Sequence, residues 1–480
     1  MPDGRFQPLR IFMSQSLPQS APAARAGGAV AWPLASLALS LLLASLGTSS
    51  ANVGLPTLAR VFDAPFSLVQ WIVLAYLLAI TLCVVGAGRL GDLIGRRRLL
   101  LAGIAVFTAA SALCGLASSL WLLLAARALQ GAGAAVMMAL TMAFVGDLLP
   151  RERTGSAMGL LGTMSAVGTA LGPTLGGALI AALGWRWIFL ANLPLGLLAM
   201  ALAGRYLPAD RPRAAAGARF DAAGTLLLAV ALAAYALAMT LGRGHFSGLN
   251  AGLLLAAVAG GWLFLRVEAR TASPLLDPAL LRQPRLGAGL AMNALVSTVM
   301  MATLVVGPFY LTQALGLSAA QAGLAMSAGP VVSALCGVPA GRLVDRYGAG
   351  RIMRAALTAL AVGTALLAAA PATLGVAGYI GPIGVLTVGY AVFQAANNTG
   401  VMAAIGAHQR GLVSGMLNLS RNLGLVTGAS VMGAVFAAGA GAADLAGASA
   451  AAVARGMALT FGVAAALGAA ALALAWRERA

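Results

Sequence analysis

Charged side chains are scarce in this sequence of 480 residues, and lysine is absent altogether. Only 9% of the residues are charged, whereas 61% are hydrophobic, and the mean hydropathy is +0.93. Soluble proteins carry charge on about a quarter of their residues. Because so few polar groups cannot cover the surface of a folded chain, that surface must face an apolar medium. The composition excludes a soluble globular protein and predicts one embedded in a lipid bilayer.

Cysteine and histidine are also rare. The three cysteines, Cys83, Cys114 and Cys336, all fall inside apolar stretches, where they form neither a disulfide framework nor a spaced metal site. The two histidines, His245 and His408, fall in loops. A membrane enzyme would need clustered reactive groups within the membrane, and the sequence contains no such cluster. We therefore expect no catalytic residues, no metal and no cofactor.

Apolar stretches of membrane-spanning length recur from Pro33 to Trp476. A span requires about 20 apolar residues, and it must be helical because lipid offers the backbone no hydrogen-bond partner. The alternating pattern of a membrane β-barrel is missing. We predict an all-α membrane protein with fourteen transmembrane helices, near residues 33–57, 68–90, 99–118, 120–144, 156–183, 187–204, 222–242, 249–266, 287–313, 319–341, 352–371, 375–403, 412–438 and 452–475.

The net charge of +18 reflects topology rather than a nucleic-acid partner. All 30 basic residues are arginine. Most lie in the tails and in alternate loops; four lie in the opposite loops, at Arg60, Arg186, Arg243 and Arg455, and two lie within spans, at Arg127 and Arg421. Arginine gathers on the cytoplasmic side of membrane proteins. We expect a multi-pass protein of the cell (inner or plasma) membrane with both termini in the cytoplasm.

The chain repeats itself. The pattern G-R-L-x-D-x-x-G-x-x-R occurs at residues 88–98 and again at 341–351, a separation of 253. Gly168, Gly172 and Gly177 recur 256 residues later. The two loops are eight spans apart, which predicts two pseudo-symmetric six-helix bundles separated by two extra helices, a 6 + 2 + 6 arrangement. Such repeats are typical of secondary transporters, whose binding sites lie between the repeats near mid-membrane.

The predicted segments follow from these spans. They are a flexible cytoplasmic tail (1–32), an N-terminal six-helix bundle (33–204), a linker with two inserted helices (205–270), a C-terminal six-helix bundle (271–475) and a short cytoplasmic tail (476–480).

Four motifs carry a family resemblance. Residues 88–98 resemble the span 2–3 loop signature of the major facilitator superfamily, and Arg-Ala-Leu-Gln-Gly-Ala-Gly-Ala-Ala at 127–135 resembles its span 4 signature. Gly-Thr-Ala-Leu-Gly-Pro-Thr-Leu-Gly-Gly at 168–177 is similar to the span 5 signature of antiporters. Trp-Arg-Trp-Ile-Phe-Leu-Ala-Asn-Leu-Pro-Leu-Gly at 185–196 is similar to a run in the fourteen-span drug/proton antiporters. The resemblance implies a multidrug efflux antiporter that exports small organic molecules by alternating access.

The motifs also indicate where the mechanism resides. Asp92 can accept hydrogen bonds from arginines or from a helix N-terminus, so the loop is a candidate gate with Gly88, Asp92, Gly95, Arg96 and Arg98. Arg127 lies about 12 Å into span 4, where an arginine costs about 3 kcal/mol. By resemblance Arg127 takes part in proton movement, and the relay candidates are Arg127, Gln130 and Asp147.

The span 5 motif predicts a bent and smooth helix. Pro173 breaks the helical hydrogen-bond ladder, and flanking glycines allow another helix to approach closely. We interpret this segment as a hinge or gate formed by Gly168, Gly172, Pro173, Gly176 and Gly177, with simple close packing as the alternative.

The sequence departs from the family at one position. The fourteen-span exporters that this sequence resembles usually carry an aspartate in span 1. In this sequence Gly47 stands at that position. None of the twelve acidic residues falls near mid-membrane. We therefore expect a neutral, weakly polar or anionic cargo. Proton coupling would use Asp147, Asp92 or a carboxyl group of the substrate.

Polar side chains in apolar spans are the candidates for the substrate cavity, although many could instead bond neighbouring helices. They are Asn52, Trp71, Tyr76, Gln313, Asn397, Asn398 and Arg421. The sequence thus predicts a monomeric, proton-coupled exporter of a small-molecule substrate. An uncoupled facilitator or an importer is the alternative within transport, and a membrane enzyme or a receptor is disfavoured.

Overall fold

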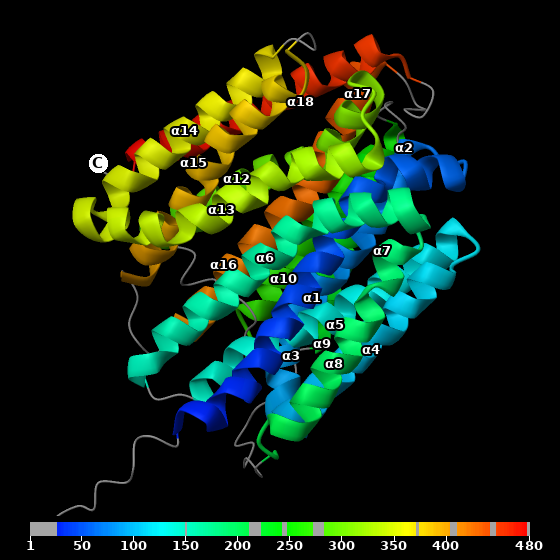
Figure 1. Ribbon diagram of the computed structural model, residues 1–480. Helices are drawn as coiled ribbons and strands as arrows, with labels where there is room; N and C mark the ends of the chain where they lie inside the picture. Colours follow the sequence, from blue (N-terminus) through cyan, green and yellow to red (C-terminus); the bar gives the residue numbers. More distant parts are fainter. Residues whose placement is uncertain are drawn as a thin grey trace, which may run out of the picture.

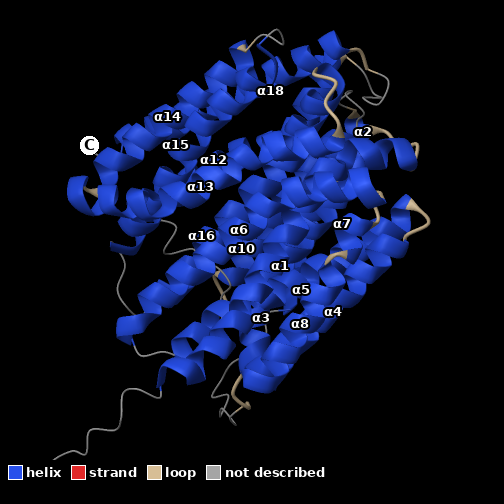
Figure 2. Ribbon diagram, in the orientation of Figure 1, coloured by secondary structure: helices blue, strands red, loops and turns tan. Residues whose placement is uncertain are grey.

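The computed structural model describes residues 26–148, 151–210, 222–241, 247–271, 283–370, 374–403, 410–441 and 448–477. These residues form helices joined by short loops and contain no strand (Figures 1 and 2). The helices are α1 Ala26–Val61, α2 Phe66–Val69, α3 Trp71–Ile94, α4 Arg96–Leu116, α5 Leu120–Leu148, α6 Arg151–Leu183, α7 Trp187–Leu190, α8 Asn192–Tyr206, α9 Ala222–Thr240, α10 Gly248–Glu268, α12 Pro284–Phe309, α13 Ala319–Tyr347, α14 Ala349–Ala369, α15 Gly375–Ala403, α16 Arg410–Thr427, α17 Gly433–Ala440 and α18 Ala450–Arg477, with π-helical turns η1 Tyr310–Ala314 and η3 Gly428–Met432.

Thirteen helical segments in the described part of the chain are long and apolar enough to cross a membrane. A further apolar stretch, Val167–Leu183, forms part of α6. The predicted all-helical membrane fold is therefore confirmed. Several helices extend past the predicted apolar spans, because hydrogen bonding continues into the polar ends where hydropathy falls.

The helices pack mainly with others from the same part of the chain, and this packing defines two halves. We call α1–α8 the N-terminal half and α12–α18 the C-terminal half. Within the N-terminal half, α1 packs against α6 and α8, and α5 packs against α3 and α4. Within the C-terminal half, α14 packs against α15 and α18, and α12 packs against α16. Helices α9 and α10 pack against each other, and α9 also contacts α3 and η3 (Figure 1).

The halves meet chiefly where α6 packs against α13, with further contacts between α1 and α12 and between α3 and α16. The sequence repeat is visible in the backbone of each half. Gly95, between α3 and α4, and Gly348, between α13 and α14, both have positive φ, at 104° and 84°. These two glycines are 253 residues apart, so the repeated loop pattern marks the same sharp turn in each half.

Candidate functional site

Arg127 lies at the centre of a buried polar cluster in the N-terminal half. Its side chain is 0% exposed. Nε donates to the carbonyl oxygen of Ile72 at 2.8 Å, and one terminal nitrogen donates to the carbonyl oxygen of Gly47 at 3.0 Å and to Oε1 of Gln130 at 2.5 Å. The other terminal nitrogen has no hydrogen-bond partner. The guanidinium carbon lies 4.1 Å from the ring centroid of Tyr76, a cation–π contact.

A chain of hydrogen bonds extends this cluster toward α4. Gln130 Nε2 donates to Oγ of Ser111 at 2.7 Å, and Ser111 donates to the carbonyl oxygen of Phe107 at 2.7 Å. The Tyr76 hydroxyl donates to the carbonyl oxygen of Ala44 on α1 at 2.7 Å. The sequence placed Arg127 and Gln130 in a charge relay and Tyr76 in a substrate cavity. The structure brings all three together in one buried network that connects α1, α3, α4 and α5.

Gly47 belongs to the same cluster, and its surroundings leave little room for a side chain. A Cβ atom built at this position would lie 3.2 Å from the Phe107 ring and 3.3 Å from the Tyr76 hydroxyl. Phe107 and Tyr76 thus occupy the space into which the aspartate of the resembling exporters would extend. In its place, the backbone carbonyl of Gly47 accepts a hydrogen bond from Arg127.

The cationic cluster has no acidic partner among the described side chains. No ion pair to Arg127 occurs there, and carbonyl oxygens, an amide oxygen and aromatic faces supply the negative potential around its guanidinium group. The side chains of Asp92 and Asp147 lie outside the described residues. Glu268, which the sequence placed in a loop, is instead the last residue of α10 and only 1% exposed.

The glycines of the span 5 motif bring α6 into direct contact with α1. A Cβ atom at Gly168 would meet the Leu42 carbonyl oxygen, and one at Gly172 would meet Ser49 Oγ. A Cβ atom at Gly176 would lie 2.9 Å from a methyl carbon of Val53. Because these positions have no room for a larger residue, glycine is required for the close approach of the two helices.

The last part of the same motif faces the other half of the molecule. A Cβ atom at Gly177 would meet the carbonyl oxygen of Ala319 at the start of α13, and one at Gly323 would meet the carbonyl oxygen of Pro173. Thr174 and Ser327 share a hydrogen bond across this interface. The two halves therefore meet through close backbone contacts and this hydrogen bond at the end where α6 finishes and α13 begins.

The repeated glycines make the same two kinds of contact in the C-terminal half, one within the half and one with the other half. Gly424 packs against the Ala294 carbonyl oxygen of α12. Gly428 lies in η3, where a Cβ atom would be 2.5 Å from the Met301 side chain, also on α12. Gly433 faces Gln70 at the start of α3, in the other half. The third glycine of each repeat thus lies at the contact between the halves.

The opposite end of α13 is not covered in this way. Cβ atoms at Gly337 and Gly341 would meet nothing within 4 Å, and Leu335 is 72% exposed. Along α13, tight contact with α6 near Gly323 thus gives way to open surroundings toward Tyr347. Among the described residues, the tight backbone contacts between α6 and α13 therefore lie at one end of the two helices.

Two glycines of the span 2–3 loop, Gly88 and Gly95, have different structural roles. Gly95 forms the turn between α3 and α4, whereas Gly88 lies within α3, where a Cβ atom would meet nothing within 4 Å. The turn therefore depends on Gly95, and Gly88 takes no part in it. Arg96 donates to the carbonyl oxygen of Ala143 on α5 at 3.4 Å.

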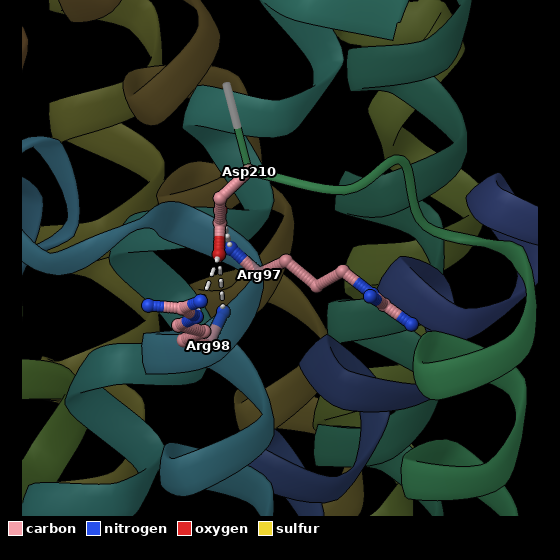
Figure 3. Close-up of polar contacts among 3 residues, drawn as sticks. All are labelled: Arg97, Arg98 and Asp210. Carbon is pink, nitrogen blue, oxygen red and sulfur yellow. Dashed lines mark hydrogen bonds and ion pairs between the residues drawn. The ribbon is translucent and has the colours of Figure 1, made fainter. Parts of the chain in front are cut away.

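Asp210 caps the helix that begins in this loop (Figure 3). Its Oδ1 accepts from the backbone N–H of Arg97 at 2.8 Å and its Oδ2 accepts from that of Arg98 at 3.2 Å. The Arg98 side chain approaches the same carboxylate at 4.0 Å, and the Arg97 side chain extends away to the carbonyl oxygen of Gly204. The sequence assigned an acceptor role of this kind to Asp92. It missed Asp210, whose only signal was an acidic residue in an arginine-rich stretch soon after span 6.

Two further predicted cavity residues, both in the N-terminal half, make hydrogen bonds within the protein. Asn52 is fully buried and donates to the carbonyl oxygen of Thr48 in its own helix at 2.9 Å. Trp71 Nε1 donates to the Thr240 hydroxyl at 3.0 Å and so ties α3 to α9. The Trp71 contact matches the helix-bonding alternative, whereas the Asn52 contact lies within a single helix.

The predicted cavity residues of the C-terminal half do not form one cluster. Asn397 is buried and donates to the Gly289 carbonyl oxygen at 3.2 Å, which joins α15 to α12. Its neighbour Asn398 is exposed. Gln313 in η1 and Arg421 on α16 are partly buried, and each has a polar atom without a hydrogen-bond partner, Oε1 and Nε respectively.

The comparisons with known proteins agree with this architecture. The riboflavin transporter RibZ of Clostridioides difficile (strain 630) is 30% identical over 411 residues, which cover 84% of this chain and 87% of RibZ. The multidrug resistance protein Stp of Mycobacterium tuberculosis (strain CDC 1551 / Oshkosh) is 32% identical over 403 residues, which cover 83% of this chain and 74% of Stp.

The fold also matches solved structures. A bacterial homologue of the human lysosomal transporter Spinster, in an inward-facing and occupied conformation, superimposes with a TM-score of 0.64 at 17% identity, covering 93% of this chain and 96% of that one. The family model of the Major Facilitator Superfamily matches residues 37–429 and also 289–480. This multi-pass membrane protein belongs to the Major Facilitator Superfamily of transporters.

Proposed function

We propose that this chain exports small organic molecules across the cell membrane by alternating access. The observation that carries the proposal is the contact between the halves at one end of α6 and α13, where Gly177 and Gly323 bring the two backbones together. Alternating access would require this contact to open. The antiporter-like span 5 motif supports export, and the name of the relative Stp supports drug-like cargo.

The finer architecture belongs to the same proposal. We place the chain among the fourteen-span drug/proton antiporters, with two six-helix bundles and α9 and α10 as the inserted pair. The positions of Gly95 and Gly348, and the matching packing of the two glycine repeats, support this arrangement. With both termini in the cytoplasm, as the arginine distribution favours, the closed end of α6 and α13 is the outer end. The conformation is then inward-facing.

The proposed cargo is neutral, weakly polar or anionic. Arg127 keeps its charge because a guanidinium group is not deprotonated in proteins, and no described carboxylate neutralises it. A cationic cargo would meet a fixed positive charge in this half. Since Arg127 is fully buried in this conformation, its contact with cargo would require the halves to rearrange. Proton coupling is assigned to Asp147, to Asp92 or to a carboxyl group of the cargo, with Arg127 and Gln130 as the polar network inside the bundle.

An uncoupled facilitator or importer of a neutral or anionic metabolite is the second candidate. Gly47 favours it, because the span 1 carboxylate is missing here and a side chain would have little space beside Phe107 and Tyr76. The relative RibZ, a riboflavin transporter by name, extends the candidate cargo beyond drugs.

Transport into proteoliposomes with an imposed pH gradient distinguishes the two candidates. The compounds tested should include cationic, neutral and anionic members of similar size. An exporter coupled to protons accumulates cargo only when the gradient is present, and dissipating the gradient with an ionophore abolishes accumulation. Equilibration at the same rate with and without the gradient would select the facilitator. Strong and selective transport of a permanent monovalent cation would contradict the proposed cargo class.

A further inference from the structure

A cavity lies within the C-terminal half at the end where α14 begins. Its volume is about 280 Å³, and residues of α12, α14, α15 and α18 line it. The polar part of the lining includes Arg285, Arg354 and Asn397, and Gly350 brings in the first turn of α14. Ala475 and the neighbouring Trp476 belong to the end of α18, and the guanidinium carbon of Arg354 lies 4.8 Å from the centroid of the Trp476 ring.

The same place in the N-terminal half is occupied by a carboxylate. Adding the repeat separation of 253 to Gly95 and Arg97 gives Gly348 and Gly350. At the first pair, the Asp210 carboxylate accepts from the Arg97 amide and fills the space where a Cβ atom of Gly95 would project. At the second pair, a Cβ atom would meet nothing within 4 Å.

The C-terminal cavity therefore has the anion-binding features of its counterpart and an open volume where the anion would lie. No described side chain caps α14, so the amides of its first turn remain available to an acceptor. The positive end of the helix dipole adds to the charge of the two arginines. No carboxylate in the described part of the chain forms an ion pair with Arg285 or Arg354.

We propose that this cavity binds a phosphate group. The arginine guanidinium groups match phosphate oxygens in geometry and charge, and amides at a helix N-terminus are common phosphate donors. A basic pocket between the helices of a membrane protein can take the headgroup phosphate of an anionic phospholipid or a soluble phosphate compound. The proposal depends neither on the direction of transport nor on the cargo, so its failure leaves the proposed function unaffected.

The experiment measures binding to the purified full-length protein in a non-ionic detergent. Native mass spectrometry counts bound phosphatidylglycerol, with diacylglycerol, which has no phosphate, as the comparison. Inorganic phosphate is titrated separately at constant ionic strength, and Trp476 fluorescence reports it because Arg354 lies against the Trp476 ring. The Trp476→Phe variant identifies the part of the signal that comes from this site.

The test variant is the double change Arg285→Gln and Arg354→Gln. Its matched control is the double change Arg342→Gln and Arg346→Gln. These two exposed arginines lie at the end of α13, close to the start of α14, and do not line the cavity. The test variant should bind phosphatidylglycerol at least about tenfold more weakly than the wild type, a change equivalent to ~1.4 kcal/mol. The control should bind as the wild type does. Saturable binding of inorganic phosphate with the same arginine dependence assigns the ligand to soluble phosphate compounds, whereas binding of the lipid alone assigns it to the headgroup.

Two outcomes would overturn the proposal. Equal weakening in the test and control variants would mean diffuse attraction to surface charge. Equal binding of phosphatidylglycerol and diacylglycerol would mean that the phosphate is not recognised.

Discussion

Replacing Gly323 by alanine should open the closed end of the molecule. The new methyl group would meet the carbonyl oxygen of Pro173 and lie 3.2 Å from Cα of Gly177, both on α6 in the other half. Backbone atoms do not move aside as a flexible side chain does, so the halves must separate at this point. Overpacking of this kind costs about 1–3 kcal/mol. If that cost falls only on the closed state, its population relative to the open state drops about 5–150-fold.

Distances between spin labels measure this shift directly. Cysteines placed at the exposed positions Leu183 on α6 and Leu324 on α13 carry the labels, in a background without the three native cysteines. Electron–electron double resonance should give a short distance in the parent protein and a longer one in Gly323→Ala. The matched control is Gly337→Ala on the same helix, where the methyl group meets nothing within 4 Å.

The reasoning fails if Gly323→Ala is folded and keeps the short distance of the parent. It fails equally if Gly337→Ala lengthens the distance as much, because the effect would then come from the helix backbone and not from the contact between the halves.

Three further predictions concern the polar groups. Arg127→Met should abolish transport and lower the free energy of unfolding by about 1–3 kcal/mol, because it removes the donor to the buried Gln130 Oε1 and to the carbonyl oxygens of Gly47 and Ile72; normal transport in a vesicle assay would contradict this. Asp210→Asn should cost about 1 kcal/mol through weaker capping of α4 and speed hydrogen exchange of the first α4 amides, whereas Asp63→Asn in an exposed loop should change neither. Asp147→Asn should abolish proton-driven uptake into inverted vesicles, and unchanged uptake would remove Asp147 from the proposed coupling.

The helical fold was predictable because its signals are local. Each span is a continuous apolar stretch, and the bilayer forces such a stretch to be a helix. The turn at Gly95 and its copy at Gly348 were marked by the repeated loop pattern, since only glycine adopts positive φ there at little cost.

The partners of the polar residues were not predictable in the same way. The sequence indicated that Arg127 needs an interior environment, because lipid does not tolerate its charge. It could not show that Tyr76 and the Gly47 carbonyl provide that environment, since these groups come from other helices. It also could not show that Asp210, more than 100 residues further along the chain than Asp92, caps α4.

The sequence by itself determined that this is a helical membrane protein with an internal repeat, because hydropathy and glycine spacing depend only on the order of the residues. Only the tertiary structure decided which faces meet: α6 against α1 through Gly168, Gly172 and Gly176, and α6 against α13 through Gly177. Nearly every surface of such a helix is apolar, so hydropathy does not distinguish a face that contacts lipid from one that contacts another helix. The close approach of backbones distinguishes them, and it exists only once the chain has folded.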